Sequence, residues 1–382
     1  MSFMLALPKI SLHGAGAIGD MVKLIAGKNW GKALIVTDGQ LVKMGLLDSL
    51  FTALDVHQLS YELFDDVFPN PTEELVQKGY AFYQAADCDF IIAFGGGSPI
   101  DTAKAIKILT ANPGPSTAYS GVGKVVNAGV PLVAINTTAG TAAEMTSNAV
   151  IIDSQRQVKE VIIDANIIPD IAVDDASVML DIPADVTAAT GMDALTHAIE
   201  AYVSVGAHPL TDANALEAIR LISQWLPIAV DDGHNLEARE MMAYGQYLAG
   251  MAFNSAGLGL VHALAHQPGA THNLPHGVCN AILLPVIEAF NRPQAVARFA
   301  RVANAMGVNI QGMSEDRASL KAIEAIRLLS ARVGIPAGFS QLGVQTSDIE
   351  GWLDKALADP CAPCNPRTAS REEVRELYLE AL

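Results

Sequence analysis

Positive charge, cysteine and long apolar stretches are all scarce in this sequence of 382 residues. The 24 Lys and Arg residues are outnumbered by 41 Asp and Glu, and the formal net charge is −17. This charge excludes bulk attraction to nucleic acid or to an anionic membrane as the basis of function. Four cysteines do not make a disulfide framework, and no apolar stretch reaches the roughly 18–20 residues of a membrane span. The N-terminal segment lacks the basic region of a signal peptide, so we expect a cytoplasmic protein.

Apolar residues make up 51% of the chain, and its length is typical of two domains. The first part alternates apolar, β-rich runs with helical patterns, which predicts a mostly parallel sheet covered on both faces. The later part is rich in Ala, Leu, Met and Glu and predicts helices. We therefore expect an α/β domain over residues 1–182 and an all-helical domain over residues 183–382. Strands are expected at 33–37, 90–94, 131–136, 149–153, 158–164 and 171–173, and helices at 73–86, 211–226, 236–253 and 319–333.

Two glycine loops are candidates for binding a dinucleotide. The segment from Gly14 to Gly19 fits G-x-G-x-x-G, and Asp38 ends the strand that follows it. This pattern fits a dinucleotide site and fits a tight turn into a helix equally well. The second loop, from Gly95 to Asp101, follows a stronger strand pattern, and its glycines favour a pyrophosphate at a helix N-terminus. There we expect Ser98 to cap the helix and Asp101 to complete a capping box.

A polar segment at residues 136–141 also follows a predicted strand. In open α/β sheets, ligands bind at the carboxyl ends of the strands, so the hydroxyl groups of this segment are suited to contact a nucleotide. Thr and Gly are ordinary loop residues, so on its own the segment is a weak signal.

Histidine is concentrated in the helical part of the chain. His262, His266, His272 and His276 fall within one short stretch, and His197 follows Asp193 by four residues. On a helix, that spacing places a carboxylate and an imidazole on one face. The cluster predicts a metal site, and imidazoles with a carboxylate and no thiolate suit Fe(II) or Zn(II). The spacing does not say which of the clustered histidines bind the metal.

Several segments along the chain match a known family. They are ALIVTD (33–38), PNPT (69–72), GGGSPID (95–101), NTTAGTAAEMT (136–146), AATGMDALTHAIEAY (188–202), GLGLVHALAHQPG (257–269), NLPHGVCNAILLP (273–285) and NPRTAS (365–370). Through them, the sequence resembles the iron-containing (group III) alcohol dehydrogenases along essentially its whole length. Within that family, residues 141–144 and 245–247 are similar to the lactaldehyde reductases (1,2-propanediol oxidoreductases), whereas residues 266–270 and 365–370 are more similar to ethanol-type members.

The resemblance implies a dehydroquinate synthase-like architecture in which an NAD-binding α/β domain precedes an all-helical metal-binding domain. It also implies that the Gly14–Gly19 run is only a structural turn. The implied metal ligands are Asp193, His197, His262 and His276, with His266 as the catalytic residue beside them. The implied cofactor contacts are Asp38, Asn70, Gly96, Gly97, Ser98, Asp101, Thr137, Thr138, Thr141, Asn148 and Lys159. The implied substrate pocket contains Asn148, Val161, Phe253, Leu258 and Cys361.

The function implied by the resemblance is hydride transfer between NAD(H) and a small primary alcohol or diol, with the metal as Lewis acid. The cofactor is expected to be NAD, because a carboxylate at Asp38 repels the extra phosphate of NADP. The metal is expected to be Fe(II), with Zn(II) as a possible substitute. The expected substrate is lactaldehyde/1,2-propanediol or a similar short chain such as ethanol, and the expected assembly is a homodimer or larger. A zinc-dependent polyol dehydrogenase of the glycerol type is the alternative. The roles of His272 and of the Cys361/Cys364 pair stay open.

Overall fold

The computed structural model describes residues 3–156 and 158–382 of the chain. These residues form two compact units. One unit holds Ala6–Thr138 and Ala142–Met179, and we call it the sheet unit. The other, the helical unit, holds Leu180–Leu382 together with Ala139–Thr141 and residues 3–5.

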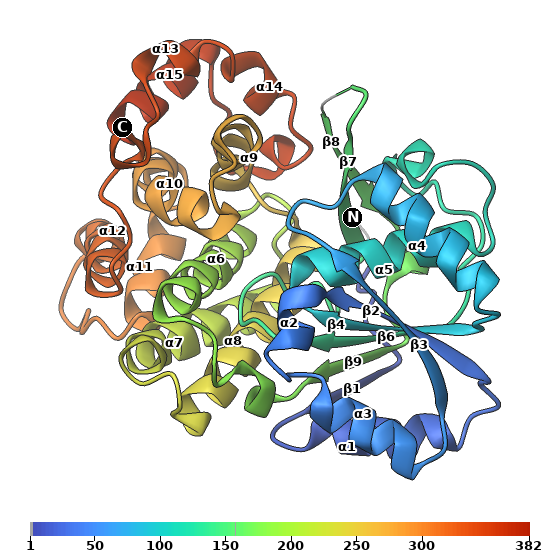
Figure 1. Ribbon diagram of the computed structural model, residues 1–382. Coiled ribbons are helices and arrows are strands. Elements are labelled where there is room, and N and C mark those ends of the chain that lie inside the picture. Colours follow the sequence, from blue (N-terminus) through green and yellow to red (C-terminus); the bar gives the residue numbers. More distant parts are fainter. Residues whose placement is uncertain (1–2, 157) are drawn as a thin grey trace. The chain divides into compact units, whose positions relative to one another are not determined.

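A parallel sheet of six strands forms the centre of the sheet unit, in the order β1-β9-β6-β4-β2-β3. Its central strands, β4 and β6, are buried along their whole length, as expected for a sheet covered on both faces. Helices α1 and α3 cover one face, and α4 and α5 cover the other (Figure 1). The strands are β1 (Ile10–His13), β2 (Lys32–Asp38), β3 (Ser60–Val67), β4 (Phe90–Gly95), β6 (Leu132–Asn136) and β9 (Ile171–Asp174), and the helices are α1 (Ala17–Ala26), α2 (Gly39–Lys43), α3 (Asp48–Val56), α4 (Glu73–Ala85) and α5 (Gly97–Leu109).

A smaller sheet completes this unit. Strand β7 (Asn148–Asp153) pairs antiparallel with β8 (Val158–Ile163), and the short β5 (Gly121–Val122) pairs parallel with β8.

Helix α6 (Ala184–Val203) is the core element of the helical unit and is packed against α7, α8 and α10. Nearly every residue in its last four turns is buried, because Ala and Gly along its length let neighbours approach from several sides. Gly191 is an example, since a Cβ there would lie 2.3 Å from Cδ1 of Leu226. The remaining helices are α7 (Pro209–Asp231), α8 (Leu236–Ala256), α9 (Leu260–His272), α10 (His276–Asn291), α11 (Val296–Ala305), α12 (Glu315–Arg332), α13 (Thr346–Ile349), α14 (Leu353–Leu357) and α15 (Arg371–Glu380).

The predicted fold class, a mostly parallel α/β part followed by a helical part, is confirmed. The six predicted strands all exist, with ends that differ by one residue or so. The sequence reasoning missed β3, an edge strand with exposed acidic residues, and placed the start of α12 four residues too late. No single described helix is long and apolar enough to cross a membrane, although the bent pair α8 and α9 meets that criterion when the two are taken together.

Candidate active site

Three potential metal ligands converge inside the helical unit. Asp193 on α6, His262 on α9 and His276 at the start of α10 each offer one ligand atom, and these atoms lie within 4.8 Å of one another. Oδ1 of Asp193 is 3.9 Å from Nε2 of His262 and 3.7 Å from Nε2 of His276. Asp193 and His262 are each only 2% exposed. A buried carboxylate facing two imidazoles is a donor set that Fe(II) and Zn(II) accept.

Asn280 shows how the protons of this cluster are arranged. Its Nδ2 donates to Oδ1 of Asp193 at 2.6 Å and lies 3.1 Å from Nε2 of His262 and 3.0 Å from Nε2 of His276. An amide nitrogen donates and does not accept, so both Nε2 atoms present lone pairs to the same point. The other end of the amide, Oδ1, is buried without a hydrogen-bond partner among the described residues. The two hydrogens of Nδ2 cannot serve all three atoms, and three converging acceptors fit a cation well.

His197 lies beside these three residues but is not one of the three whose ligand atoms converge. Its ring centroid is 4.6 Å from that of His262 and 4.4 Å from that of Phe253. Burial lowers the pKa of His197 below its usual value and that of His262 well below it. Both imidazoles are therefore neutral, which is the form that binds a metal.

Two carboxylates lie within hydrogen-bond distance of Nδ1 of two neighbouring histidines. Nδ1 of His262 is 2.5 Å from Oε2 of Glu200, and Nδ1 of His266 is 2.8 Å from Oδ2 of Asp359. The His266 ring stacks on His276, with centroids 5.4 Å apart. Burial opposes ionisation of Asp359 most strongly, yet the hydrogen bond and charge of His266 together lower the pKa of this carboxyl. The arrangement fixes the ring of His266 next to the cluster.

The second glycine loop leads directly into α5. Gly95 has φ 147°, a conformation that favours glycine, and a Cβ there would lie 2.5 Å from Cγ of Pro99. The helix begins at Gly97, earlier than expected, with Gly96 as its N-cap and no side-chain cap. The expected capping box of Ser98 and Asp101 is therefore wrong: Ser98 lies inside the first turn. The Asp101 carboxylate lies too far along the helix, and it accepts the Val150 N–H at 3.0 Å.

The N-terminus of α5 is suited to an anion. Its first turn contains no acidic residue and no side chain caps it, so its N–H groups and the positive end of the helix dipole have no carboxylate to balance them. Thr138 lies beside it, since a Cβ on Gly96 would be 3.1 Å from Oγ1 of Thr138. Gly95, the last residue of β4, also pairs in register with Asn136, the last residue of β6. The glycine loop after β4 and the polar segment after β6 therefore both start at the carboxyl ends of neighbouring strands.

The first glycine loop differs in this respect. The N–H groups of Gly16 and Ile18, at the start of α1, donate to Oδ2 of Asp175 at 3.0 and 3.2 Å. The chain's own carboxylate thus occupies the place that a phosphate would need, and it repels an anion. This geometry favours the structural turn over a dinucleotide site for Gly14–Gly19.

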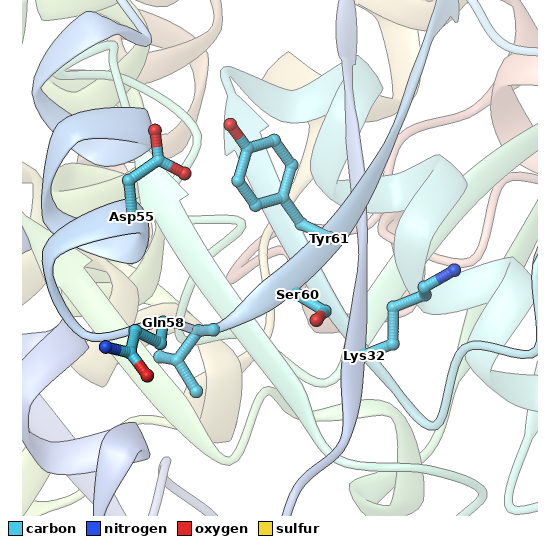
Figure 2. A pocket seen from close by; sticks show the side chains of 6 residues that line it. Lys32, Asp55, Gln58, Ser60 and Tyr61 are labelled. Atoms are coloured by element: carbon cyan, nitrogen blue, oxygen red, sulfur yellow. The ribbon is translucent and has the colours of Figure 1, made fainter.

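A hollow of about 450 Å³ lies at the amino ends of the strands, where β2 and β3 begin. Figure 2 shows Asp55 and Tyr61 on its wall, with Lys32 directed away from them. Ligands of open α/β sheets bind at the carboxyl ends of strands, and this hollow lies at the amino ends. It has no place in the candidate site. Its lining residues are Lys32, Asp55, Gln58, Leu59, Ser60 and Tyr61.

Comparison with known proteins finds a family model that matches each of the two units. The model described as "Iron-containing alcohol dehydrogenase" matches residues 8–176, and "Fe-containing alcohol dehydrogenase family, C-terminal" matches residues 187–382. The chain belongs to the iron-containing alcohol dehydrogenase family. The predicted family and enzyme class are thereby confirmed, and the chain is an oxidoreductase of the family that acts on alcohols and diols.

Relatives within the iron-containing alcohol dehydrogenase family are nearly equally identical in sequence to this chain, but their names give different substrates. The "NAD-dependent methanol dehydrogenase" of Bacillus methanolicus is 44% identical over 98% of this chain and 99% of its own. The "Lactaldehyde reductase" of Escherichia coli K12 is 42% identical over the whole of both chains. A solved structure of a 1,3-propanediol oxidoreductase matches with a TM-score of 0.98 at 42% identity, again over 100% of both chains. Overall identity therefore does not select a substrate.

The other residues that the family resemblance assigns to the cofactor lie in several elements of the structure. Asp38 caps α2, with Oδ1 accepting the N–H groups of Gln40 and Leu41. Asn70 has φ 59° and lies between β3 and α4. Thr137 donates its N–H to the Gly95 carbonyl at 3.1 Å.

The remaining residues assigned to the cofactor lie later in the chain. Thr141 lies in the segment that packs with the helical unit, Asn148 begins β7 and Lys159 is on β8. Their contacts with a cofactor stay predictions.

The residues that the family resemblance assigns to the substrate pocket come from both units. In the helical unit, Phe253 stacks on His197, Leu258 follows α8, and Cys361 donates its backbone N–H to Asp359. In the sheet unit, Asn148 and Val161 lie on the paired strands β7 and β8. Their roles also stay predictions.

The structure gives the surroundings of the three residues whose roles the sequence leaves open: His272, Cys361 and Cys364. The ring of His272 is held by Asp348, 3.2 Å from Nε2, and by Thr271, 2.9 Å from Nδ1. Both ring nitrogens are thus engaged at the C-terminal end of α9. Burial raises the pKa of Cys361 well above its usual range and raises that of Cys364, so both thiols stay protonated. Neither is poised for redox chemistry.

Sequence reasoning missed four residues that shape these sites: Glu200, Asn280, Asp359 and Asp175. Helical spacing contained a signal for two of them, because Glu200 is two turns after Asp193 and Asn280 is one turn after His276. Asp359 and Asp175 reach their partners from 93 and 159 or 157 residues away, and no local pattern points to them.

Proposed function

We propose that this chain is a metal-dependent oxidoreductase that interconverts a small primary alcohol or diol and its aldehyde with NAD(H). The observation that carries the proposal is the convergence of ligand atoms from Asp193, His262 and His276 on one point. The metal would be held by these three residues and by His197, with Fe(II) as the resident ion and Zn(II) as a substitute. A metal there supplies a Lewis acid, which polarises an aldehyde oxygen and lowers the pKa of an alcohol.

NAD(H) supplies or accepts the hydride, and the protein's part is to bind and orient it. The uncapped N-terminus of α5 supports a pyrophosphate there, with Gly96, Gly97 and Ser98 providing the approach. Thr138 beside Gly96 supports a contact from the neighbouring segment. At the end of β2, both capping bonds of Asp38 go to Oδ1, so Oδ2 is the atom that would accept the ribose 2′-hydroxyl.

His266 is the proposed carrier of the proton that accompanies hydride transfer. Its Nδ1 bonds to Asp359, so proton exchange falls to Nε2. Asp359 holds the ring in one orientation, as the carboxylate partner of an acid–base histidine does.

The substrate is proposed to be short, with lactaldehyde/1,2-propanediol or ethanol/acetaldehyde as the best candidates. In the helical unit, the pocket residues implied by the family resemblance include the apolar Phe253 and Leu258, which suit a short chain with few polar groups. The names of the relatives, which include methanol, lactaldehyde and 1,3-propanediol, support the same size class. A cytoplasmic location and a homo-oligomeric assembly remain predictions from the sequence.

The test is NADH oxidation with short aldehydes by protein stripped of metal under anaerobic conditions. We expect turnover of lactaldehyde, acetaldehyde or propionaldehyde only after Fe(II) is added. Reduction of NAD⁺ with glycerol-type polyols in the presence of Zn(II), without NADH oxidation by aldehydes in the presence of Fe(II), would support the zinc polyol dehydrogenase instead. NADH binding without any of these activities would contradict the proposed reaction.

Replacing Asp38 with glycine is expected to shift coenzyme preference from NADH toward NADPH by about tenfold or more, because the repelling carboxylate is removed. The measurement is kcat/KM for each coenzyme with one aldehyde. Asp38→Asn is the matched control, since its amide oxygen preserves the α2 cap while the charge is lost. An unchanged preference in both variants would show that Asp38 does not face the ribose.

A further inference from the structure

We propose that Glu200 is a positioning residue for the metal centre, in which one carboxylate holds both the outer nitrogen of His262 and the start of the helix that carries it. The inference rests on the proposed function, since it assumes that His262 binds a metal. Glu200 is on α6 and is 1% exposed. Its Oε2 is 2.5 Å from Nδ1 of His262, and its Oε1 accepts the Val261 N–H at 2.7 Å. Both oxygens therefore act on consecutive residues of α9.

The first role of Glu200 is to fix the tautomer of His262. The lone pair on Nε2 faces the cluster, as its contact with the Asn280 amide shows, so the proton of the neutral ring is on Nδ1. That proton points at Oε2 of Glu200. A carboxylate in this place keeps the ring oriented and makes Nε2 a stronger donor to a metal.

The second role is to cap α9, which has no side-chain cap of its own at Gly259. The first free N–H groups of the helix bind side chains from elsewhere: Leu260 donates to Oδ1 of Asn365 at 3.1 Å, and Val261 donates to Glu200. The position of His262 along its helix and the orientation of its ring therefore depend on the same carboxylate.

Gly259 makes the close approach possible. A Cβ at this position would lie 2.7 Å from Oδ1 of Asn365 and 3.0 Å from Oε1 of Glu200. Any larger residue would displace one of the two capping groups.

A second buried carboxylate belongs to the same network and touches none of the proposed ligands. Glu288 accepts the side-chain amide of Asn291 at 3.0 Å, and Asn291 forms a reciprocal amide pair with Asn365 at 3.0 and 2.7 Å. Glu288, like Glu200, is essentially inaccessible to solvent. Glu288→Gln is therefore a matched control for Glu200→Gln, because it turns a buried carboxyl group into an amide without removing a hydrogen bond to a ligand.

The test is the affinity of the full-length protein for Zn(II), measured by competition with a chelator. The glutamine of Glu200→Gln has one accepting oxygen, which serves Val261 or His262 but not both. We expect the Zn(II) affinity to fall by about 10- to 100-fold, and the absorption spectrum of the Co(II)-substituted protein to change, while the helical content is retained. Glu288→Gln should keep the wild-type spectrum and an affinity close to that of the wild type.

Glu200→Asp is the second variant, because it keeps the carboxyl group but is one methylene shorter and cannot reach both donors. We expect the same loss of affinity, and this variant decides the outcome if Glu200→Gln does not fold. Wild-type affinity and an unchanged Co(II) spectrum in the folded variants would overturn the positioning role alone. Failure of the wild-type protein to bind either metal would instead overturn the proposed metal centre, and with it this inference.

Discussion

Replacing His262 with alanine is expected to abolish metal binding and to lower kcat/KM for an aldehyde and NADH by at least about 10³-fold, or about 4 kcal/mol. The reason is that His262 supplies one of three converging ligand atoms and lies between Asp193 and Glu200. The measurements are metal content after Fe(II) reconstitution and steady-state kinetics. A variant that keeps both its metal and its activity would show that the cluster is not the catalytic centre.

Two further histidines of α9 provide the comparison. His266→Ala should retain the metal but lose about 10²- to 10⁴-fold in kcat, because a proton carrier is removed and no ligand is lost. His272→Ala should change neither quantity, since its ring is engaged by Asp348 and Thr271. Loss of metal from His266→Ala would make His266 a ligand. Loss of metal from His272→Ala would contradict the separation of the three roles along the helix.

A carboxylate placed at Ser98 is expected to weaken NADH binding by about 100-fold or more while slightly stabilising the fold. Ser98 is in the first turn of α5, where an acid interacts favourably with the helix dipole, by about 0.3–1 kcal/mol, but repels a pyrophosphate. The measurements on Ser98→Asp are NADH affinity by fluorescence titration and the free energy of unfolding. Opposite changes in stability and affinity are difficult to obtain from general damage to the fold.

Asp175→Asn is the reciprocal control at the start of α1. Its carboxylate caps Gly16 and Ile18, so its replacement should lower the free energy of unfolding by about 1 kcal/mol and leave NADH affinity unchanged. If Ser98→Asp binds NADH normally while Asp175→Asn alters binding, the assignment of the two glycine loops must be exchanged.

The fold could be predicted from the sequence where burial leaves a clear apolar pattern. Strands β4 and β6 are continuous apolar runs, and each was predicted almost to the residue. Strand β3 was not, because it is an edge strand whose acidic residues face solvent and interrupt the apolar pattern. The start of α5 was misplaced because Ser-Pro is a strong local start signal, whereas the turn at Gly95 lets the helix begin earlier.

Only part of the candidate site could be predicted from the sequence. The spacing of Asp193 and His197 and the clustering of histidines pointed to a metal, but they did not separate the converging His262 and His276 from His272. Glu200 was overlooked because α6 is buried on nearly all sides, so a buried glutamate has no polar face to mark it. Asp359 acts on His266 across 93 residues, and such a contact exists only in the folded chain.

The capping of α9 has a consequence for the order in which the protein is made. The Leu260 N–H is bound by Asn365, a residue that the ribosome adds 105 residues later. The described strands all precede residue 175, so the sheet unit can form while synthesis continues. The helix that carries His262 and His266 gains this capping bond only after residue 365 has been made. During synthesis, Glu200 can therefore cap Val261 and orient His262 before Asn365 exists, whereas the complete set of capping bonds at the start of this helix needs residues from both sides of it.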